Sequence, residues 1–196
     1  SGEPHDIGEW LGETRPEVEA AAGSPLQERV GPYSLLRRIG AGGMAEVFLA
    51  ELVRPGGFKK VVVLKRILPQ LSGDAAYREM FLREGRTAAL LNHPNVVQVY
   101  DLGEAEGGTC FLAMEHVDGL TLSDLARRAW SARRSLPLEV VASCVADAAL
   151  GLAADIHQGL VHRDISPDNL MVSREVVTKV VDFGIARPKT GAHITA

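Results

Sequence analysis

Apolar and polar residues alternate along much of the first half of the chain, in short runs separated by turn residues. Alternation with a period of two is typical of β-strands that bury one face. We therefore predict strands at residues 33–39, 45–52, 61–68, 96–102 and 109–114.

One helix is predicted to interrupt these strands, at residues 74–91. Apolar side chains recur there at the three-and-four spacing of one helix face, and Glu84 lies in the middle of that stripe. The members of the stripe are Tyr77, Phe81, Glu84, Ala88 and Leu91.

Helices replace strands in the second half of the chain, after Asp118. We predict them at residues 122–134 and 138–157, and the second follows Pro137 and ends near Gly159. Its apolar stripe is Val141, Val145, Ala148, Leu152 and Ile156. Short apolar runs predict two brief strands at 170–172 and 179–181. A strand-rich half followed by a helical half predicts an α+β fold with two lobes.

Charge is unevenly distributed along the 196 residues, whose hydrophobic content of 46% suits one domain with a real core. The formal charge is −4, but residues 1–30 contain seven acids and two bases, which leaves 18 acids and 19 bases for the rest. We interpret residues 1–32, rich in Glu, Gly, Pro and Ala, as a disordered acidic tail. The short patch around Trp10 could dock on a partner.

The composition argues against several classes of protein. The near-neutral remainder has no basic run, so nucleic-acid binding is not predicted. Its small arginine cluster is interpreted as the solvated face of a helix, with a binding patch as the alternative. The cluster consists of Arg127, Arg128, Arg133 and Arg134. Cys110 and Cys144 have no metal-ligand spacing and are interpreted as buried free thiols.

A membrane or secretory segment is not predicted. No apolar run approaches the roughly 18 residues that cross a bilayer, and the N-terminus lacks the regions of a signal peptide. We therefore expect a cytoplasmic protein.

A glycine-rich segment links the first two predicted strands. Glycines there allow backbone N–H groups to approach phosphates without obstruction by side chains. A plain hairpin is the alternative, and a dinucleotide-binding turn is disfavoured because a strand follows instead of a helix. The segment is Gly40, Ala41, Gly42, Gly43, Met44, Ala45, Glu46 and Val47.

Lys65 lies inside an apolar strand, on the same face as Val61, Val63 and Ile67. A buried ammonium needs a partner anion, although an edge lysine that reaches water is the alternative. Glu84, in the inward stripe of the next helix, is the candidate partner.

Polar residues are unusually dense between the long helix and the strand at 170–172. His162, Arg163, Asp164, Asp168 and Asn169 fall in this loop, a density that packing does not require. The loop therefore indicates a site. The sequence Asp182-Phe183-Gly184 follows the next strand, and its acid could serve as a metal ligand, although an isolated Asp-Phe-Gly is more often an ordinary turn.

Taken together, these motifs resemble the signature set of protein kinases over residues 33–187. The shared order is a glycine-rich loop, a strand lysine, a helix glutamate, His-Arg-Asp with an Asn five residues after the Asp, and Asp-Phe-Gly. Details such as Gly42-Gly43-Met44 are most similar to bacterial, eukaryotic-like (Hanks-type) serine/threonine protein kinases. The resemblance implies a bilobal fold with an antiparallel N-lobe sheet and a mainly helical C-lobe.

The resemblance also implies ATP and Mg²⁺ as cofactors and a protein substrate with a Ser or Thr hydroxyl. Lys65, fixed by Glu84, would hold the α and β phosphates under the backbone of the glycine-rich segment. Asp164 would accept or orient the hydroxyl proton, and Asn169 and Asp182 would bind magnesium.

The same resemblance places adenine between two groups of residues. Val47 and Val63 would lie above it and Met171 below, with Met114 as gatekeeper. Hinge hydrogen bonds would come from the backbone of Glu115, His116 and Val117. His162 and Phe183 would belong to the internal spine, and Arg163 would await phosphorylation of Thr190 or Thr195.

Three residues depart from the family pattern. Ala45 replaces the third glycine of the loop, and Val63 replaces the usual alanine over adenine, which could tighten the pocket. Ser166 stands where Ser/Thr kinases usually have a lysine, so a positive charge beside the transition state is lost. Either the rate falls or another cation substitutes, and the choice of Ser/Thr over other hydroxyls is weakened.

By this resemblance, residues 33–117 form the N-lobe and hinge, and residues 118–196 form a partial C-lobe that ends in the activation loop. A kinase domain should continue for roughly another hundred residues. We therefore expect a fragment of marginal stability or activity, with apolar surface exposed on the helix at 138–157. The alternatives are a nucleotide-binding pseudokinase that acts by binding partners and a small-molecule kinase of related fold.

Overall fold

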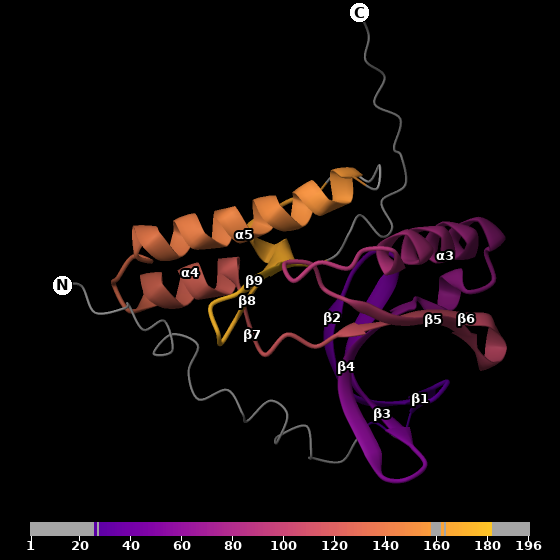
Figure 1. Cartoon of the computed structure of the whole chain (residues 1–196). Helices are drawn as coiled ribbons and strands as arrows, with labels where there is room; N and C mark the ends of the chain where they lie inside the picture. Colours follow the sequence, from indigo (N-terminus) through magenta and orange to yellow (C-terminus); the bar gives the residue numbers. More distant parts are fainter. Residues whose placement is uncertain (1–25, 27, 158–161, 163, 182–196) are drawn as a thin grey trace, which may run out of the picture.

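The computed structural model describes residue 26, residues 28–157, residue 162 and residues 164–181. These residues form a strongly curled sheet with one helix, followed by a helical part with a small second sheet (Figure 1). The expected two-lobed α+β arrangement is confirmed.

The first sheet has six antiparallel strands in the order β1-β2-β3-β4-β6-β5. The strands are β1 (Arg29–Val30), β2 (Tyr33–Ala41), β3 (Ala45–Arg54), β4 (Phe58–Ile67), β5 (Val99–Ala105) and β6 (Thr109–Glu115). A short 3₁₀ turn, η2 (Glu106–Gly108), joins β5 to β6. Four of the predicted strands are confirmed, and the largest difference in their bounds is at β4, which begins three residues before the expected start at 61. The strand expected at 96–102 instead begins at Val99.

Alternate side chains of each strand point to opposite faces of this sheet, and each face packs against a separate cluster of apolar residues. One face closes on itself around Tyr33, whose ring meets Phe111 edge to face with centroids 5.6 Å apart. Burial raises the pKa of Tyr33, and its hydrogen bond to Asp101 Oδ2, 3.0 Å long, acts in the same direction. The other face packs against α3 (Ala75–Ala89).

The helix α3 begins where the sequence predicts it. The Asp74 side chain accepts hydrogen bonds from the backbone N–H groups of Ala76 and Tyr77, as an N-cap does. A short 3₁₀ turn, η1 (Pro69–Leu71), connects β4 to this helix. Phe81, Gly85 and Ala88 form its buried face, and Leu91 just beyond the helix is also buried. Three members of the predicted stripe are thus confirmed, whereas Tyr77 and Glu84 are half-buried.

The expected tail of residues 1–32 is too long at its C-terminal end. Arg29–Val30 form β1, which pairs with the start of β2, and Val30 is buried against the core of the sheet. Arg66 forms an ion pair with Glu28 and so attaches this segment to β4. The composition did not predict this strand because a two-residue edge strand has too few positions to show alternation. Residues 1–25 lie outside the described residues.

The second part of the chain surrounds a three-stranded antiparallel sheet in the order β7-β8-β9. Its elements are β7 (Gly119–Thr121), α4 (Leu122–Ser131), α5 (Leu138–His157), the 3₁₀ turn η3 (Pro167–Asn169), β8 (Leu170–Ser173) and β9 (Thr178–Val180). The bounds of α5 agree with the prediction, whereas α4 ends before the expected Arg134. Strand β7 was not predicted.

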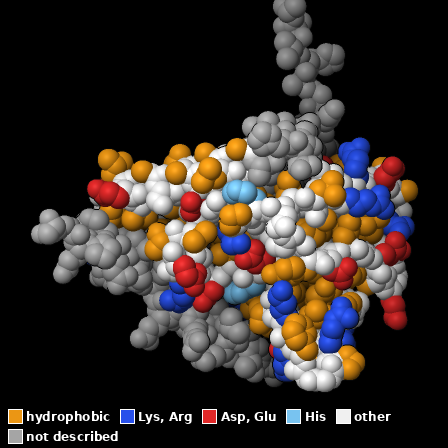
Figure 2. Space-filling view, in the orientation of Figure 1, with side chains coloured by type: hydrophobic (Ala, Val, Ile, Leu, Met, Phe, Trp, Pro, Cys, Tyr) orange, Lys and Arg blue, Asp and Glu red, His pale blue; other side chains and the backbone are white. Residues whose placement is uncertain are grey.

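The buried face of α5 includes Ala148 of the predicted stripe, and Leu152 packs beside it, but the rest of that face differs from the prediction. Val140, Cys144 and Ala148 are buried against the small sheet and α4, whereas Val145 is 57% exposed. Because α5 is apolar almost all round, periodicity alone did not fix which side faces the core. The predicted exposure of apolar side chains is confirmed by Leu138 and Leu150, and orange side chains follow the upper edge of the molecule along α5 in Figure 2.

Two other expectations concern single groups. Cys110 and Cys144 are both buried and free, as predicted. Burial raises the pKa of the Cys144 thiol above its ordinary value. Within the part of the chain that the structure describes, no helix has the length and apolarity to span a membrane.

The two sheets are joined by residues 95–97, which lie against β9 and which we call the clasp. Val97 N–H donates to the Val180 carbonyl at 3.0 Å, and Val180 N–H donates to the Asn95 carbonyl at 2.8 Å. The buried Asn95 side chain also donates to the Thr178 carbonyl at 2.9 Å. This parallel pairing explains why the predicted strand at 96–102 is divided.

The clasp leaves no room for a side chain at Gly151 of α5. A Cβ atom there would lie 2.7 Å from the Asn95 carbonyl oxygen. We predict that Gly151→Ala destabilises the chain by about 1–3 kcal/mol through overpacking, although alanine favours helices. Urea unfolding measures this. Gly73→Ala is the matched control, because a Cβ there meets nothing within 4 Å. Equal stability of the two variants would contradict the prediction.

Candidate active site

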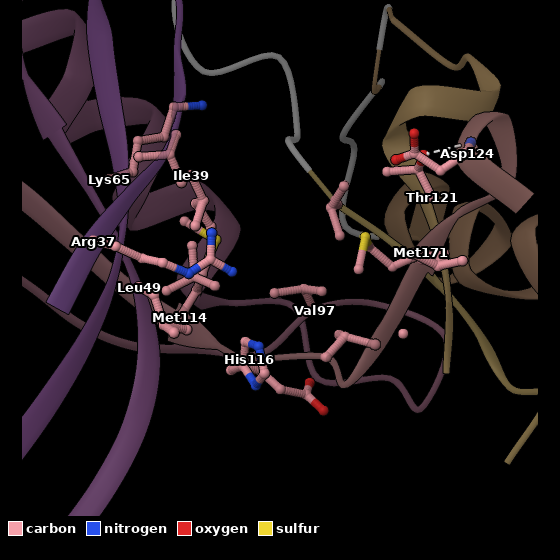
Figure 3. A pocket seen from close by; sticks show the side chains of 17 residues that line it. Arg37, Ile39, Leu49, Lys65, Val97, Met114, His116, Thr121, Asp124 and Met171 are labelled. Atoms are coloured by element: carbon pink, nitrogen blue, oxygen red, sulfur yellow. Dashed lines mark hydrogen bonds between the residues drawn. The ribbon is translucent and has the colours of Figure 1, made fainter. Parts of the chain in front are cut away.

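A cavity of about 350 Å³ lies between the first sheet and the second part of the chain. Figure 3 shows Lys65, Ile39 and Leu49 on the side of the curled sheet, and Met171, Thr121 and Asp124 on the opposite side. Segments far apart in sequence therefore form its two walls.

Strand pairing determines which side chains form the wall of the cavity on the side of the first sheet. Val47 of β3 lies directly opposite Lys65 of β4, and Leu49 lies opposite Val63. Met114 of β6 lies opposite Val63 on the other side of β4. Directly opposed residues share a face of a sheet, so these five side chains point into one cavity. All five line it.

The opposite wall comes from β8 and the residue after β9. The end of β6 and the residues after it also line the cavity. Met171 lines the cavity from β8, together with Val181 beyond β9. Glu115, the last residue of β6, and Val117, in the connection that follows it, also line the cavity. Seven of the residues predicted to bind a nucleotide thus share this cavity: Val47, Val63, Lys65, Met114, Glu115, Val117 and Met171.

The glycine-rich segment forms the β2–β3 connection beside the cavity. Gly42 N–H donates to the Ala45 carbonyl at 2.8 Å, which closes the turn. A Cβ at Gly43 would meet nothing within 4 Å, so packing inside the chain does not require glycine there. Gly40, Ala41, Gly42, Gly43 and Met44 are not among the residues that line the cavity.

Charged side chains brace the strands that flank this connection. Glu46 accepts hydrogen bonds from Arg38 of β2, at 3.1 Å, and from Arg66 of β4, at 3.2 and 3.1 Å. Burial alone would raise the pKa of Glu46, but these two arginines lower it below its ordinary value. The glutamate therefore remains ionised and links β2, β3 and β4.

Lys65 is buried, with 7% of its surface exposed, and Glu84 is half-buried on α3. Lys65 lies at the end of the cavity away from His116 (Figure 3). The predicted pairing of Lys65 with Glu84 stays a prediction.

Asp164 and Asn169 meet in the loop before β8. The Asn169 amide nitrogen donates to the Asp164 backbone carbonyl at 2.7 Å and lies 3.5 Å from Asp164 Oδ2. Since the amide nitrogen has acceptors on that side, the amide oxygen is left as a possible metal ligand. Asn169 N–H also donates to the Ser166 carbonyl, which closes the turn η3.

The strand before Asp182 is attached to the same loop. Val181 N–H donates to the Asn169 carbonyl at 3.0 Å, and the buried His162 ring has Nε2 3.0 Å from the Val181 carbonyl. These contacts agree with an internal, structural place for His162. Asp182 itself lies outside the described residues, as do Arg163, Phe183, Thr190 and Thr195. In the described part of the chain, no group of three His, Cys, Asp or Glu residues could hold a metal.

Sequence reasoning missed several residues of the cavity. Ile39 and Leu49 could have been found from the alternation of β2 and β3, because each lies two positions from another cavity residue. Thr121 caps α4 and bonds Asp124, a pattern that marks a helix start but not a cavity. The missed lining residues are Arg37, Ile39, Leu49, Val97, Gly119, Leu120, Thr121, Asp124 and Val181, whereas His116, predicted as part of the hinge, does line the cavity.

An ion pair links the hinge side of the cavity to β9. Lys179 Nζ lies 2.9 Å from the Glu115 carboxylate, which also accepts from the Gln98 N–H at 3.2 Å. Glu115 N–H in turn donates to the Gln98 carbonyl at 2.8 Å. Both charged side chains are mostly buried, at 23% and 19% exposed. The pair therefore helps to hold the two walls at a fixed spacing.

This architecture agrees with that of a known family. Residues 33–194 match the family model described as "Protein kinase domain", so the chain belongs to that family. The resemblance to protein kinases is thereby confirmed.

Two curated bacterial relatives illustrate the similarity. The chain is 43% identical over 185 residues, 90% of its length, to the tyrosine-protein kinase MasK of Myxococcus xanthus. It is 39% identical over 168 residues, 83% of its length, to the serine/threonine-protein kinase PknB of Mycolicibacterium smegmatis. The chain spans 28% and 26% of the lengths of these two proteins.

Solved structures support the fold independently. The kinase domain of PknI from Mycobacterium tuberculosis superposes with a TM-score of 0.63 at 34% identity. The match covers 81% of this chain and 61% of that one. The protein-kinase fold predicted from the motifs is therefore confirmed.

We predict that Glu115 and Lys179 are energetically coupled. A double-mutant cycle with Glu115→Gln and Lys179→Met should give a coupling free energy of about 1–2 kcal/mol in urea unfolding, because the pair is mostly removed from water. The matched control is Asp118 with Arg174, 3.1 Å apart but 51% and 31% exposed, which should couple by about 0.5 kcal/mol or less. Equal coupling in both cycles would refute the assignment.

Proposed function

We propose that this chain carries the ATP-binding and phosphoryl-transfer residues of a serine/threonine protein kinase. The observation that carries the proposal is one arrangement: a buried lysine in an apolar cavity, with Asp164 and Asn169 in hydrogen-bond contact on the loop that precedes the opposite wall. Positioning and electrostatic stabilisation are what phosphoryl transfer demands of a protein. Residues 33–117 would serve as N-lobe and hinge, and residues 118–196 as part of the C-lobe.

The cavity suits the base and sugar of ATP. Val47 and Val63 on one wall and Met171 on the other offer apolar surface to a flat ring, and Met114 closes the inner side between them. The backbone of Glu115, His116 and Val117 would supply hinge hydrogen bonds. Val63, larger than the alanine usual at this position, would narrow the space for the ring.

The phosphates would lie toward Lys65, whose buried ammonium places a positive charge in the cavity. Glu84 on α3 would orient that lysine. The connection from Gly40 to Met44 would cover the phosphates with backbone N–H groups, which agrees with the open space around Gly43. Because packing inside the chain does not require glycine at position 43, we attribute the glycine to close approach of the phosphates.

The donor set also suits Mg²⁺, which prefers oxygen ligands and binds through few protein groups plus phosphate oxygens. Asn169 offers an amide oxygen, and Asp182 would add a carboxylate. Magnesium, when bound, neutralises charge that develops on the transferred group. Asp164 would accept or orient the proton of the substrate hydroxyl.

The acceptor hydroxyl is proposed to be that of Ser or Thr in a protein, as the name of PknB indicates for that relative. Ser166 and the similarity to MasK, which is named a tyrosine-protein kinase, favour tyrosine as the second candidate. Matched peptides that differ only in Ser, Thr or Tyr distinguish the two. We propose a cytoplasmic location for this activity.

Asp164→Asn should abolish transfer while ATP binding persists. The change keeps the size of the side chain but removes the proton acceptor, so kcat should fall by about 10²–10⁴-fold. Transfer from labelled ATP with magnesium is measured on the chain. Asp118→Asn, which removes an acid that pairs with Arg174, is the control and should retain the rate. ATP binding without transfer that depends on Asp164 would favour the pseudokinase alternative.

Asn169→Ala should raise the magnesium concentration that gives half-maximal transfer by about tenfold or more, because an oxygen ligand is lost. The contact with Asp164 is lost in the same variant, so the dependence on magnesium is measured separately from kcat at saturating metal. Asp168→Asn, a neighbouring exposed acid in η3, is the control. An unchanged dependence in Asn169→Ala would remove this residue from the metal site.

A further inference from the structure

The arginine cluster at the end of α4 lies outside the proposed active site, and two of its members, Arg133 and Arg134, lie beside an exposed aromatic residue. Trp130 is 83% exposed, the largest exposed fraction among the large apolar side chains that the structure describes. Trp130, Ser131, Arg133, Arg134 and Ser135 line one open depression. We call this depression the Trp130 groove.

The charge around the groove is strongly positive. Residues 122–135 contain four arginines and one acid, Asp124. That acid is already engaged, because Arg127 lies 2.9 Å from it and Thr121 bonds its other oxygen. Arg133 and Arg134 follow the helix end in the exposed turn, and Arg133 has a positive φ of 54°. The groove thus combines an apolar ring with basic side chains.

The same chain contains a segment of complementary chemistry. Residues 1–25 include six acids and one arginine, together with the apolar residues Trp10 and Leu11. We propose that this acidic segment docks on the Trp130 groove of its own chain. Its carboxylates would face the arginines, and its apolar patch would cover the indole of Trp130.

The segment has the length that this docking needs. Twenty-five extended residues reach about 80 Å, whereas a domain of this size is about 40 Å across. Glu28, just after the segment, is fixed to the sheet by its ion pair with Arg66. The segment can therefore reach any side of the molecule from that anchor. The basic cluster, interpreted from the sequence as the solvated face of a helix, is in this proposal a binding patch instead.

Trp10 and Trp130 are the two tryptophans of the chain, so Trp10→Phe makes Trp130 the sole indole reporter. Quenching by acrylamide, a neutral molecule, measures its accessibility in the complete chain. In the test variant, Glu3, Asp6, Glu9, Glu13, Glu17 and Glu19 are changed to their amides. We expect the quenching constant of Trp130 to rise about twofold in that variant. We expect a similar rise in the Trp10→Phe chain with its six acids intact at 0.5 M NaCl, because salt screens exposed charges.

Substitutions in the groove provide the reciprocal test. Arg133→Asn removes a charge with a residue that tolerates positive φ, and should also raise the quenching constant. Lys59→Gln is the matched control, because this exposed lysine on β4 lies outside the groove and should leave Trp130 protected. If a variant unfolds, the salt titration of the Trp10→Phe chain still decides.

Three results would overturn the proposal. The first is equal quenching with and without the six acids, which would leave the groove free for an acidic partner. The second is protection that survives high salt. The third is protection that depends on chain concentration, which would indicate a second copy of the chain as the occupant.

Discussion

The clasp at residues 95–97 is the contact on which the site depends. It lies in parallel against β9, and it follows α3 and precedes β5, so it joins the curled sheet to the small sheet. The buried Asn95 amide and the close approach of Gly151 make its position specific. Without it, nothing in the sheet pairings would bring Lys65 of β4 to face Met171 of β8.

The ion pair between Glu115 and Lys179 reinforces the same junction. Glu115 accepts from Lys179 of β9 and from the backbone of Gln98, so a single carboxylate contacts both walls. The spacing of the walls therefore depends on two contacts with β9, one of backbone and one of charge. The residues of β9 that make them, Lys179 and Val180, directly precede Val181, whose N–H donates to the Asn169 carbonyl. Wall spacing and loop geometry are thus set by the same short strand.

Outside the cavity, two surfaces expose apolar side chains. Apolar side chains are exposed along α5, whereas the end of α4 presents Trp130 among arginines. The chain's own acidic segment matches the second surface in charge. The proposed catalytic residues and the proposed docking surface lie on different elements, so one can be altered while the other remains intact.

The sequence by itself determined the elements, because alternation, helical periodicity and end signals are local: β6 and α5 lie where they were predicted. It also determined the chemical groups of the proposed active site, since Lys65, Asp164 and Asn169 belong to motifs that are recognised by their order and spacing in the sequence. Tertiary structure decided the rest. A helix as apolar as α5 does not reveal which face is buried, and a run such as 96–102 does not show that its first residues will pair with β9. The partners that settle both questions lie on other elements, α4 and the small sheet for α5 and β9 for residues 95–97, so local patterns do not reveal them.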